Sequence, residues 1–124
     1  MTKFDPSKLT IDALVSAYRE LCVKDYDARD CGDRPKVRRY FDEMTAIEEV
    51  LRSRGPEARR ALIPLLKDHH AQVRLNTAKA LLAVVPAEAR ATLEQLAAHA
   101  PDGSQSGSAG MCLELLDNGW FKPT

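Results

Sequence analysis

The sequence predicts an all-α fold, a short right-handed α-solenoid in which three helical hairpins, about six helices, stack within one domain. Apolar residues recur at helical spacing in several segments, and Pro, Gly or acidic residues separate these segments. Aromatic residues make up only 6% of the 124 residues, so Leu, Ala and Val must form most of the core. A hairpin of this size cannot bury its apolar face alone, which is why we expect stacking.

The charge balance and the cysteines restrict the classes of partner and compartment. Lys and Arg total 18, as do Asp and Glu, so the net charge is zero and nucleic acid is disfavoured as a partner. No apolar stretch is long enough to span a membrane, and the first ten residues lack a signal-peptide core. Cys22, Cys31 and Cys112 form no CxxC motif. We interpret them as reduced thiols of a cytoplasmic protein.

The first helix is expected over residues 11–26, because Thr10 can cap it and the following apolar residues share one face. These residues are Ile11, Leu14, Val15, Tyr18, Leu21 and Cys22. The acidic run 25–33 does not match a calcium-binding loop, since Arg29 and Lys36 stand where oxygen ligands are required. We expect a solvated connector there, with Gly32 turning the chain and no bound metal.

The second helix is expected over residues 34–54, with Pro35 in its first turn and Gly55 after its end. Its apolar face comprises Val37, Tyr40, Phe41, Met44, Ile47, Val50 and Leu51. Its opposite face carries the polar residues Arg38, Asp42, Thr45 and Glu49. This pattern is typical of a helix that packs on one side and faces solvent on the other.

Residues 61–85 form the centre of the predicted stack, as two short apolar helices joined by a tight turn. Apolar positions cover so much of the second helix that we expect neighbours on more than one side. Arg74 falls inside this apolar arc and therefore needs a polar partner. We predict that Asp68 accepts hydrogen bonds from Arg74, from backbone N–H groups at the start of the helix, or from both. His69 and His70 are adjacent and face different directions, so they predict no zinc site.

The same residues resemble a HEAT repeat, which would span residues 56–85. The resemblance rests on Leu62-Ile63-Pro64-Leu65-Leu66, Asp68, Val73-Arg74, Ala78 and Ala80-Leu81. It implies a proline-bent first helix, a second helix that opens on Val-Arg, and a single HEAT-like domain over residues 1–124. The wider layout is similar to the small bacterial HEAT-like domain-of-unknown-function family numbered two thousand nineteen, which implies no known activity. That similarity rests on Val73-Arg74-Leu75-Asn76, Pro86-Ala87-Glu88-Ala89, Met111-Cys112-Leu113-Glu114 and Asn118-Gly119.

The C-terminal part is expected to form a third hairpin. A helix over residues 87–100 would bury Ala89, Leu93, Leu96, Ala97 and Ala100. A flexible polar loop over 101–108 would follow, and then a short helix over 109–118 with Met111, Cys112, Leu115 and Leu116 facing inward. Gly119 suits the position after the helix end. Trp120 and Phe121 then either cover the open end of the core or form an exposed anchor for a partner or a homodimer.

These features predict a non-catalytic protein–protein interaction module, for example an accessory or immunity-type protein with an unidentified protein partner. Stacked hairpins place their second helices on one concave face. That face would present Arg38, Asp42, Thr45, Glu49, Asn76, Lys79, Glu114 and Asn118. The sequence contains no nucleophile motif, phosphate loop or cofactor motif. One alternative is a homo-oligomer built through Trp120 and Phe121, and a less favoured one is a nucleic-acid-binding enzyme of the kind that HEAT-like DNA glycosylases represent.

Overall fold

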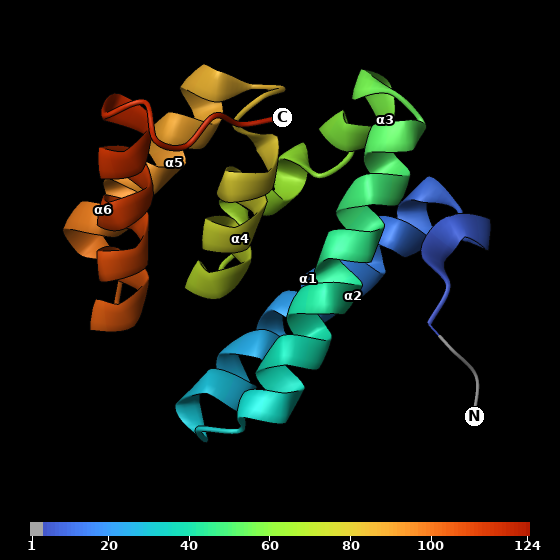
Figure 1. Cartoon of the computed structure of the whole chain (residues 1–124), viewed down its shortest axis with the longest axis horizontal. Coiled ribbons are helices and arrows are strands. Elements are labelled where there is room, and N and C mark those ends of the chain that lie inside the picture. The colour runs from blue at the N-terminus through green and yellow to red at the C-terminus, as the bar shows by residue number, and fades with distance from the viewer. Residues whose placement is uncertain (1–3) are drawn as a thin grey trace. The chain divides into compact units, whose positions relative to one another are not determined.

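A computed structural model describes residues 4–124, and every regular element in that part of the chain is a helix (Figure 1). The helices form two compact units, one ending at Ala61 and the other running from Leu62 to Thr124. The first contains η1 (Pro6–Lys8), α1 (Ile11–Asp30), α2 (Arg34–Ser53) and α3 (Pro56–Arg60). The second contains η2 (Ile63–Lys67), α4 (Ala71–Leu81), α5 (Pro86–His99) and α6 (Gly103–Asp117). The predicted all-α class is therefore confirmed.

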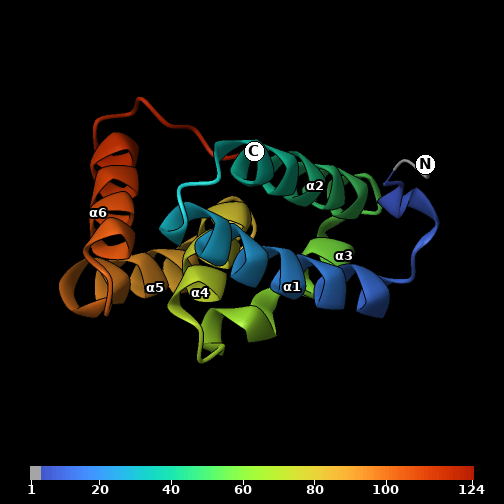
Figure 2. The same ribbon diagram turned by 90° about the horizontal axis from the view of Figure 1, so that it is seen from below.

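In the first unit, α1 and α2 lie side by side and run in opposite directions, as predicted for the first hairpin (Figures 1 and 2). Thr10 caps α1 by accepting a hydrogen bond from the Ala13 N–H at 3.2 Å. Cys22 is fully buried, as predicted, and its Sγ lies 3.9 Å from Met44 Sδ on α2. The core residues of the two helices are Leu14, Tyr18, Leu21, Cys22 and Ala28 on α1 and Met44, Ile47 and Leu51 on α2.

The predicted connector over residues 25–33 is wrong for most of its length, because α1 continues to Asp30. Asp25 is only 1% exposed, and its carboxylate accepts a hydrogen bond from Arg29 Nε at 2.9 Å, one helical turn later. This ion pair compensates the buried charge of Asp25 inside α1. The acidic composition of the same segment predicts a solvated loop. The chain then turns at Gly32, whose φ of 71° suits glycine, and Asp33 caps α2.

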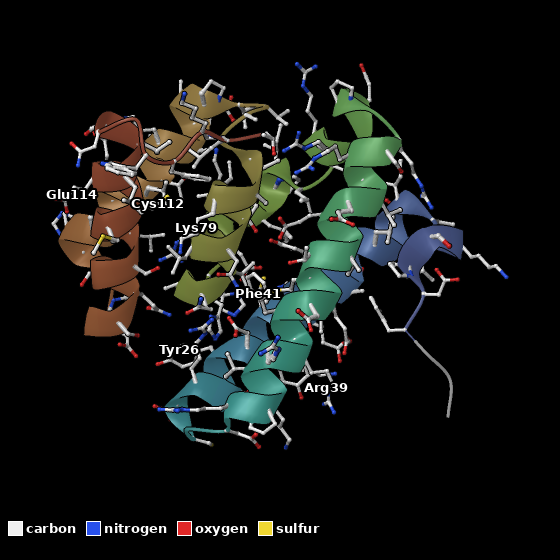
Figure 3. The ribbon with its side chains drawn as sticks, in the orientation of Figure 1. Tyr26, Arg39, Phe41, Lys79, Cys112 and Glu114 are labelled. Carbon is white, nitrogen blue, oxygen red and sulfur yellow. The ribbon has the colours of Figure 1, made fainter. Side chains whose placement is uncertain are left out.

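The apolar face of α2 is buried only in its second half. Met44, Ile47 and Leu51 are buried, whereas Phe41 is 57% exposed (Figure 3). The inward position predicted for Phe41 is therefore wrong. In an antiparallel hairpin the first half of α2 faces the end of α1, where the buried residues are the small Ala28 and the acidic Asp25 rather than large apolar side chains.

The proline-bent first helix that the HEAT resemblance implies is replaced by two short pieces, α3 and η2. The break follows from Pro64, which has no N–H to donate to the carbonyl of Arg60 and whose ring would clash with that carbonyl. α3 ends at Arg60, four residues before the proline. α3 packs on α2, whereas η2 packs on α4, so the two pieces belong to different units.

In the second unit, α4 packs against η2, α5 and α6. Val73, Thr77, Ala78 and Leu81 are fully buried, which confirms that α4 is covered on more than one side. The helix is shorter than predicted, because the chain leaves it after Leu81 in a turn that leads to α5. On α5 the buried residues Ala89, Leu93 and Leu96 are among those predicted to face inward.

The predicted flexible loop over residues 101–108 is wrong, because α6 begins at Gly103 rather than at residue 109. Asp102 caps the helix, and its Oδ1 accepts hydrogen bonds from the Ser104 N–H and hydroxyl, both at 2.8 Å. Gln105, Ala109 and Cys112 form the buried stripe at helical spacing. Packing against α5 and α4 thus overrides the low helix propensity of the Gly and Ser residues in this segment.

Buried amides link α4 to α6 in the interior of the second unit. Gln72 Nε2 donates to Asn76 Oδ1 at 3.0 Å, and Gln72 Oε1 accepts from Gln105 Nε2 at 3.4 Å. Among the described helices, none is long and apolar enough to cross a lipid bilayer.

Candidate functional site

The most exposed large apolar residues of the second unit lie on α6 and on the segment that follows it. Met111 is 57% exposed, Leu115 37%, Trp120 81% and Phe121 36%. We call these four residues the C-terminal apolar surface. The inward positions predicted for Met111 and Leu115 are wrong, because the buried stripe of α6 runs through Gln105, Ala109 and Cys112 instead. Met111 and Leu115 stand one turn apart on the neighbouring stripe, which faces outward.

The chain reverses direction just after α6 and returns toward the last turn of the helix. Gly119 adopts a φ of 76°, as predicted for a helix-ending glycine, and its N–H donates to the Leu116 carbonyl at 3.2 Å. The Phe121 N–H donates to the Leu115 carbonyl at 3.1 Å. This turn keeps Phe121 beside α6, whereas the side chain of Trp120 extends into solvent. Trp120 therefore does not cover the end of the core, one of the two roles predicted for it.

A groove of about 280 Å³ lies beside the C-terminal apolar surface, between α4 and α6. Its lining residues are Lys79, Ser108, Met111, Cys112, Leu115 and Phe121. Lys79 Nζ donates a hydrogen bond to Ser108 Oγ at 2.7 Å, which ties α4 to the middle of α6 (Figure 3). Ser108 lies three residues before Met111 and four before Cys112, and Leu115 lies four residues after Met111 and three after Cys112, so these side chains form a continuous strip along α6.

The thiol of Cys112 lines the groove. Burial raises its pKa, and the nearby Lys79 ammonium opposes this effect without cancelling it. The thiol therefore stays protonated near neutral pH. Cys112 acts as a neutral, weakly polar wall rather than as a reactive thiolate.

The other residues predicted for the concave face are distributed over both units. Arg38, Asp42, Thr45 and Glu49 lie along one side of α2 in the first unit. Asn76 and Lys79 lie on α4, Glu114 on α6, and Asn118 forms the C-terminal cap of α6. Asn76 is engaged by the buried amide of Gln72, whereas Glu114 and Asn118 are exposed. Of this set, Lys79 is the residue that lines the groove.

Asp68 accepts hydrogen bonds both from Arg74 and from a backbone N–H at the start of α4, through two different groups. Arg74 Nη1 donates to the main-chain carbonyl oxygen of Asp68 at 2.7 Å. The carboxylate of Asp68 accepts from the His70 N–H at 2.9 Å, and His70 Nδ1 accepts from the Gln72 N–H. Both residues thus fix the turn that starts α4, and His70 acts as the helix cap. No group of three potential ligands placed to hold a metal ion occurs among residues 4–124.

A buried polar pair that the sequence patterns do not predict occurs in the first unit. Tyr18 is buried on α1, and its hydroxyl donates to Glu48 Oε2 on α2 at 2.9 Å. Burial, and then the charge of Glu48, raise the pKa of Tyr18 well above its usual value. Burial also raises the pKa of Glu48, while the hydrogen bond from Tyr18 and the charges of Arg52 and Arg59 act in the opposite direction. We assign this pair a role in stability, because it lies inside the α1–α2 hairpin.

A second hollow, of about 220 Å³, lies at the turn between α1 and α2. Its lining residues are Lys24, Asp27, Ala28, Cys31, Asp33, Lys36 and Tyr40. Two lysines and two aspartates balance one another there, and Lys36 Nζ lies 3.8 Å from Asp33 Oδ2. This mixture favours no particular ligand, whereas the groove beside α6 combines an apolar wall with one charge.

Comparisons with known proteins identify relatives of the whole chain. The family model described as "Domain of unknown function (DUF2019)" matches residues 12–117. The chain is also similar to the crystal structure of the protein RPA1889 from Rhodopseudomonas palustris CGA009. That similarity has 38% sequence identity and a TM-score of 0.92, and it covers 98% of this chain and 100% of the other. A search among curated proteins finds no match.

Proposed function

The chain belongs to the DUF2019 family, and we propose that it is a non-catalytic interaction module whose C-terminal apolar surface binds a partner protein. The observation that carries the proposal is the exposure of Trp120, at 81%, beside Met111, Leu115 and Phe121. Tryptophan, methionine and phenylalanine are enriched in protein interfaces, and a few such anchors supply most of the binding energy.

Binding of a partner would remove the apolar area of these side chains from water. A buried aromatic side chain covers about 150–250 Å², and apolar burial contributes roughly 25 cal/mol per Å². Covering Trp120 alone would therefore contribute on the order of 4–6 kcal/mol, before the cost of association is subtracted. A surface of this kind favours a protein partner, since the net charge of zero gives no long-range attraction for a polyanion.

The helices beneath the surface support its use as a preformed binding site. Ala109 and Cys112 hold α6 against the core, and the Lys79–Ser108 hydrogen bond fixes it to α4. Near the end of α6, Arg90 Nη2 on α5 lies 3.0 Å from Asp117 Oδ1. A rigid support reduces the entropy lost when a partner binds. We propose that the chain acts as an accessory or immunity-type protein in the cytoplasm, where its three cysteines, which form no disulfide, stay reduced.

The test uses a photo-crosslinking amino acid placed at position 120 or 111 in cells of the native host. The matched control places it at Phe41, which is as exposed as Met111 but lies on α2 in the other unit. We expect one specific crosslinked protein from positions 120 and 111 and none from position 41. The identified protein is then purified and mixed with the chain, and it should shift the emission of Trp120, the chain's single tryptophan, to shorter wavelength.

Two results would overturn the proposal. One is an identical crosslinking pattern from all three positions. The other is a crosslinked species of twice the chain's mass, together with Trp120 emission that shifts with protein concentration, which would make the chain a homo-oligomer. Trp120→Ala provides a further control, because an exposed side chain contributes little to folding and its loss should change stability by no more than about 0.5 kcal/mol.

A further inference from the structure

The first half of α6, residues 103–110, is a helix that its own residues favour only weakly. It contains Gly103, Gly107 and Gly110, none of which has a positive φ. A Cβ added at each of them would meet no atom of another element within 4 Å, so neither the backbone conformation nor close packing requires glycine there. In a helix interior, glycine disfavours the helix about fivefold relative to alanine. The second half, residues 111–117, contains no glycine and consists mainly of Leu, Met and Glu, which favour a helix.

This first half also buries little apolar surface. Its buried residues are Gln105 and Ala109, so opening it would return mainly one methyl group and one glutamine stem to water. Polar contacts hold it closed instead. They are the Asp102 cap and the hydrogen bond that Ser108 Oγ accepts from Lys79 Nζ. Hydrogen bonds of this kind are exchanged for hydrogen bonds to water when a segment opens, which makes opening less costly than the loss of an apolar contact area.

The buried side chain of Gln105 favours opening further. It is 3% exposed, and no residue in the described part of the chain donates a hydrogen bond to its Oε1. Its Nε2 donates to Gln72 Oε1 at 3.4 Å, which is longer than the usual range of about 2.7–3.2 Å. A buried acceptor without a donor bears the full cost of its desolvation, and this cost disappears once the segment opens to water.

Opening of residues 103–110 would change the groove between α4 and α6. Ser108 lines this groove and is tied to Lys79 at 2.7 Å, so opening would break the bond and remove one wall. The second half of α6 carries part of the C-terminal apolar surface and would stay in place, because Cys112 is buried. Two halves of one helix thus differ in how strongly they are held.

We propose that residues 103–110 form a gate, which opens by local unfolding while the rest of the second unit stays folded. The closed gate completes the groove. The open gate removes Ser108 from the groove and exposes Gln105 to water. This inference goes beyond the proposed function and does not depend on it, since the gate is a property of the chain alone.

Residue-resolved hydrogen exchange on the purified full chain tests the gate, under conditions in which the exchange rate reports the opening equilibrium. The amides of residues 107–110 should be at least about tenfold less protected than those inside α5. Urea below the unfolding transition should accelerate the α5 amides and leave residues 107–110 unchanged, because local opening exposes little surface. Gly107→Ala should slow exchange at residues 107–110 about fivefold.

Ala91→Gly is the matched control, because it makes the reverse change at an exposed position inside α5. It should accelerate the α5 amides about fivefold and leave residues 107–110 unchanged. Ser108→Ala tests the connection to the groove. It should accelerate exchange at residues 107–110 by about threefold or more, because the bond from Lys79 exists only in the closed state.

Three results would overturn the inference. If Ala91→Gly or low urea accelerates residues 107–110 as much as α5, the segment opens only together with the whole unit. If Gly107→Ala leaves exchange at residues 107–110 unchanged, the glycines do not set the opening equilibrium. If Ser108→Ala has no effect, opening is not coupled to the groove. The crosslinking experiment at positions 120 and 111 tests the proposed function separately.

Discussion

Tyr18 is the largest of the fully buried side chains, and it contacts an acidic side chain. Its hydroxyl donates to Glu48 Oε2 at 2.9 Å across the α1–α2 hairpin. Because both pKa values are raised by burial, the phenol stays protonated and remains a donor. A buried acceptor that loses its donor bears its full desolvation cost, so this contact has a large effect for a single hydrogen bond.

We predict that Tyr18→Phe lowers the free energy of unfolding by about 1–3 kcal/mol, since the Glu48 carboxylate would lose its donor while staying partly buried. Urea denaturation at neutral pH measures the change. Tyr40→Phe is the matched control, because the Tyr40 hydroxyl is exposed and accepts only a surface hydrogen bond from Arg39 Nη2 at 3.2 Å. Equal stability of Tyr18→Phe and wild type would contradict the prediction.

The pKa of Glu48 also predicts a pH dependence of stability. Its folded-state pKa is raised above the usual value of 4.5, so the folded state binds the proton more tightly than the unfolded state. The stabilising contribution is complete below the unfolded pKa and is lost as the pH rises through the folded pKa. Glu48→Gln has no proton to lose at this position and should not show this loss. Above about pH 4.5 the free energy of unfolding of the wild type should therefore fall relative to that of the variant. Urea denaturation between acidic and neutral pH provides the test, and a difference that is flat or of opposite sign would contradict it.

At the scale of the helix, α6 shows how capping and packing overcome composition. The segment from Gly103 to Gly110 contains three glycines and three serines, which favour loops. The Asp102 cap and the buried stripe of Gln105 and Ala109 nevertheless make it helical. The position of Ser108 in the groove depends on the helix beginning at Gly103, whereas Met111 and Leu115 also fall within the helix predicted from residue 109.

We predict that Asp102→Ala destabilises the chain by about 1 kcal/mol, because the Ser104 N–H loses its capping acceptor. Asp102→Asn should keep most of the wild-type stability, since an amide oxygen also caps helices well. Hydrogen exchange should show the change in the first turn of α6 before other helices. Uniform acceleration of exchange over all helices, with no special effect at residues 103–106, would argue against a local cap.

α3 and η2 provide the opposite case, in which one residue prevents a helix. Pro64 ends α3 at Arg60 and leaves a 3₁₀ turn, although the HEAT resemblance implies a proline-bent helix there. The proline is visible in the sequence, but a proline can either bend a helix or end it. Which of the two occurs depends on the neighbours that cover each piece, here α2 for α3 and α4 for η2.

At the scale of the whole molecule, the equal totals of 18 basic and 18 acidic residues predict that the chain does not bind duplex DNA. Binding to DNA is driven by phosphate contacts and depends strongly on salt. We expect no salt-sensitive change in the fluorescence anisotropy of a labelled duplex when the chain is added at moderate ionic strength. A basic DNA-binding protein measured in parallel serves as the positive control. A clear salt-dependent rise in anisotropy would revive the alternative of a nucleic-acid enzyme.

The sequence by itself determined the helical class, the α1–α2 hairpin, the covered faces of α4 and α5, and the chain reversal at Gly119. These features depend on local spacing, caps and glycine conformation, which neighbouring residues along the chain specify. The tertiary structure alone decided that Asp25 is buried, that Phe41, Met111 and Leu115 are exposed, and that Lys79 meets Ser108. When a helix has apolar residues on two adjacent stripes, its sequence does not show which stripe is buried. The shapes of the neighbouring helices against which it packs decide this. The candidate groove is defined by that choice, so it becomes visible only once α4, α5 and α6 are packed together.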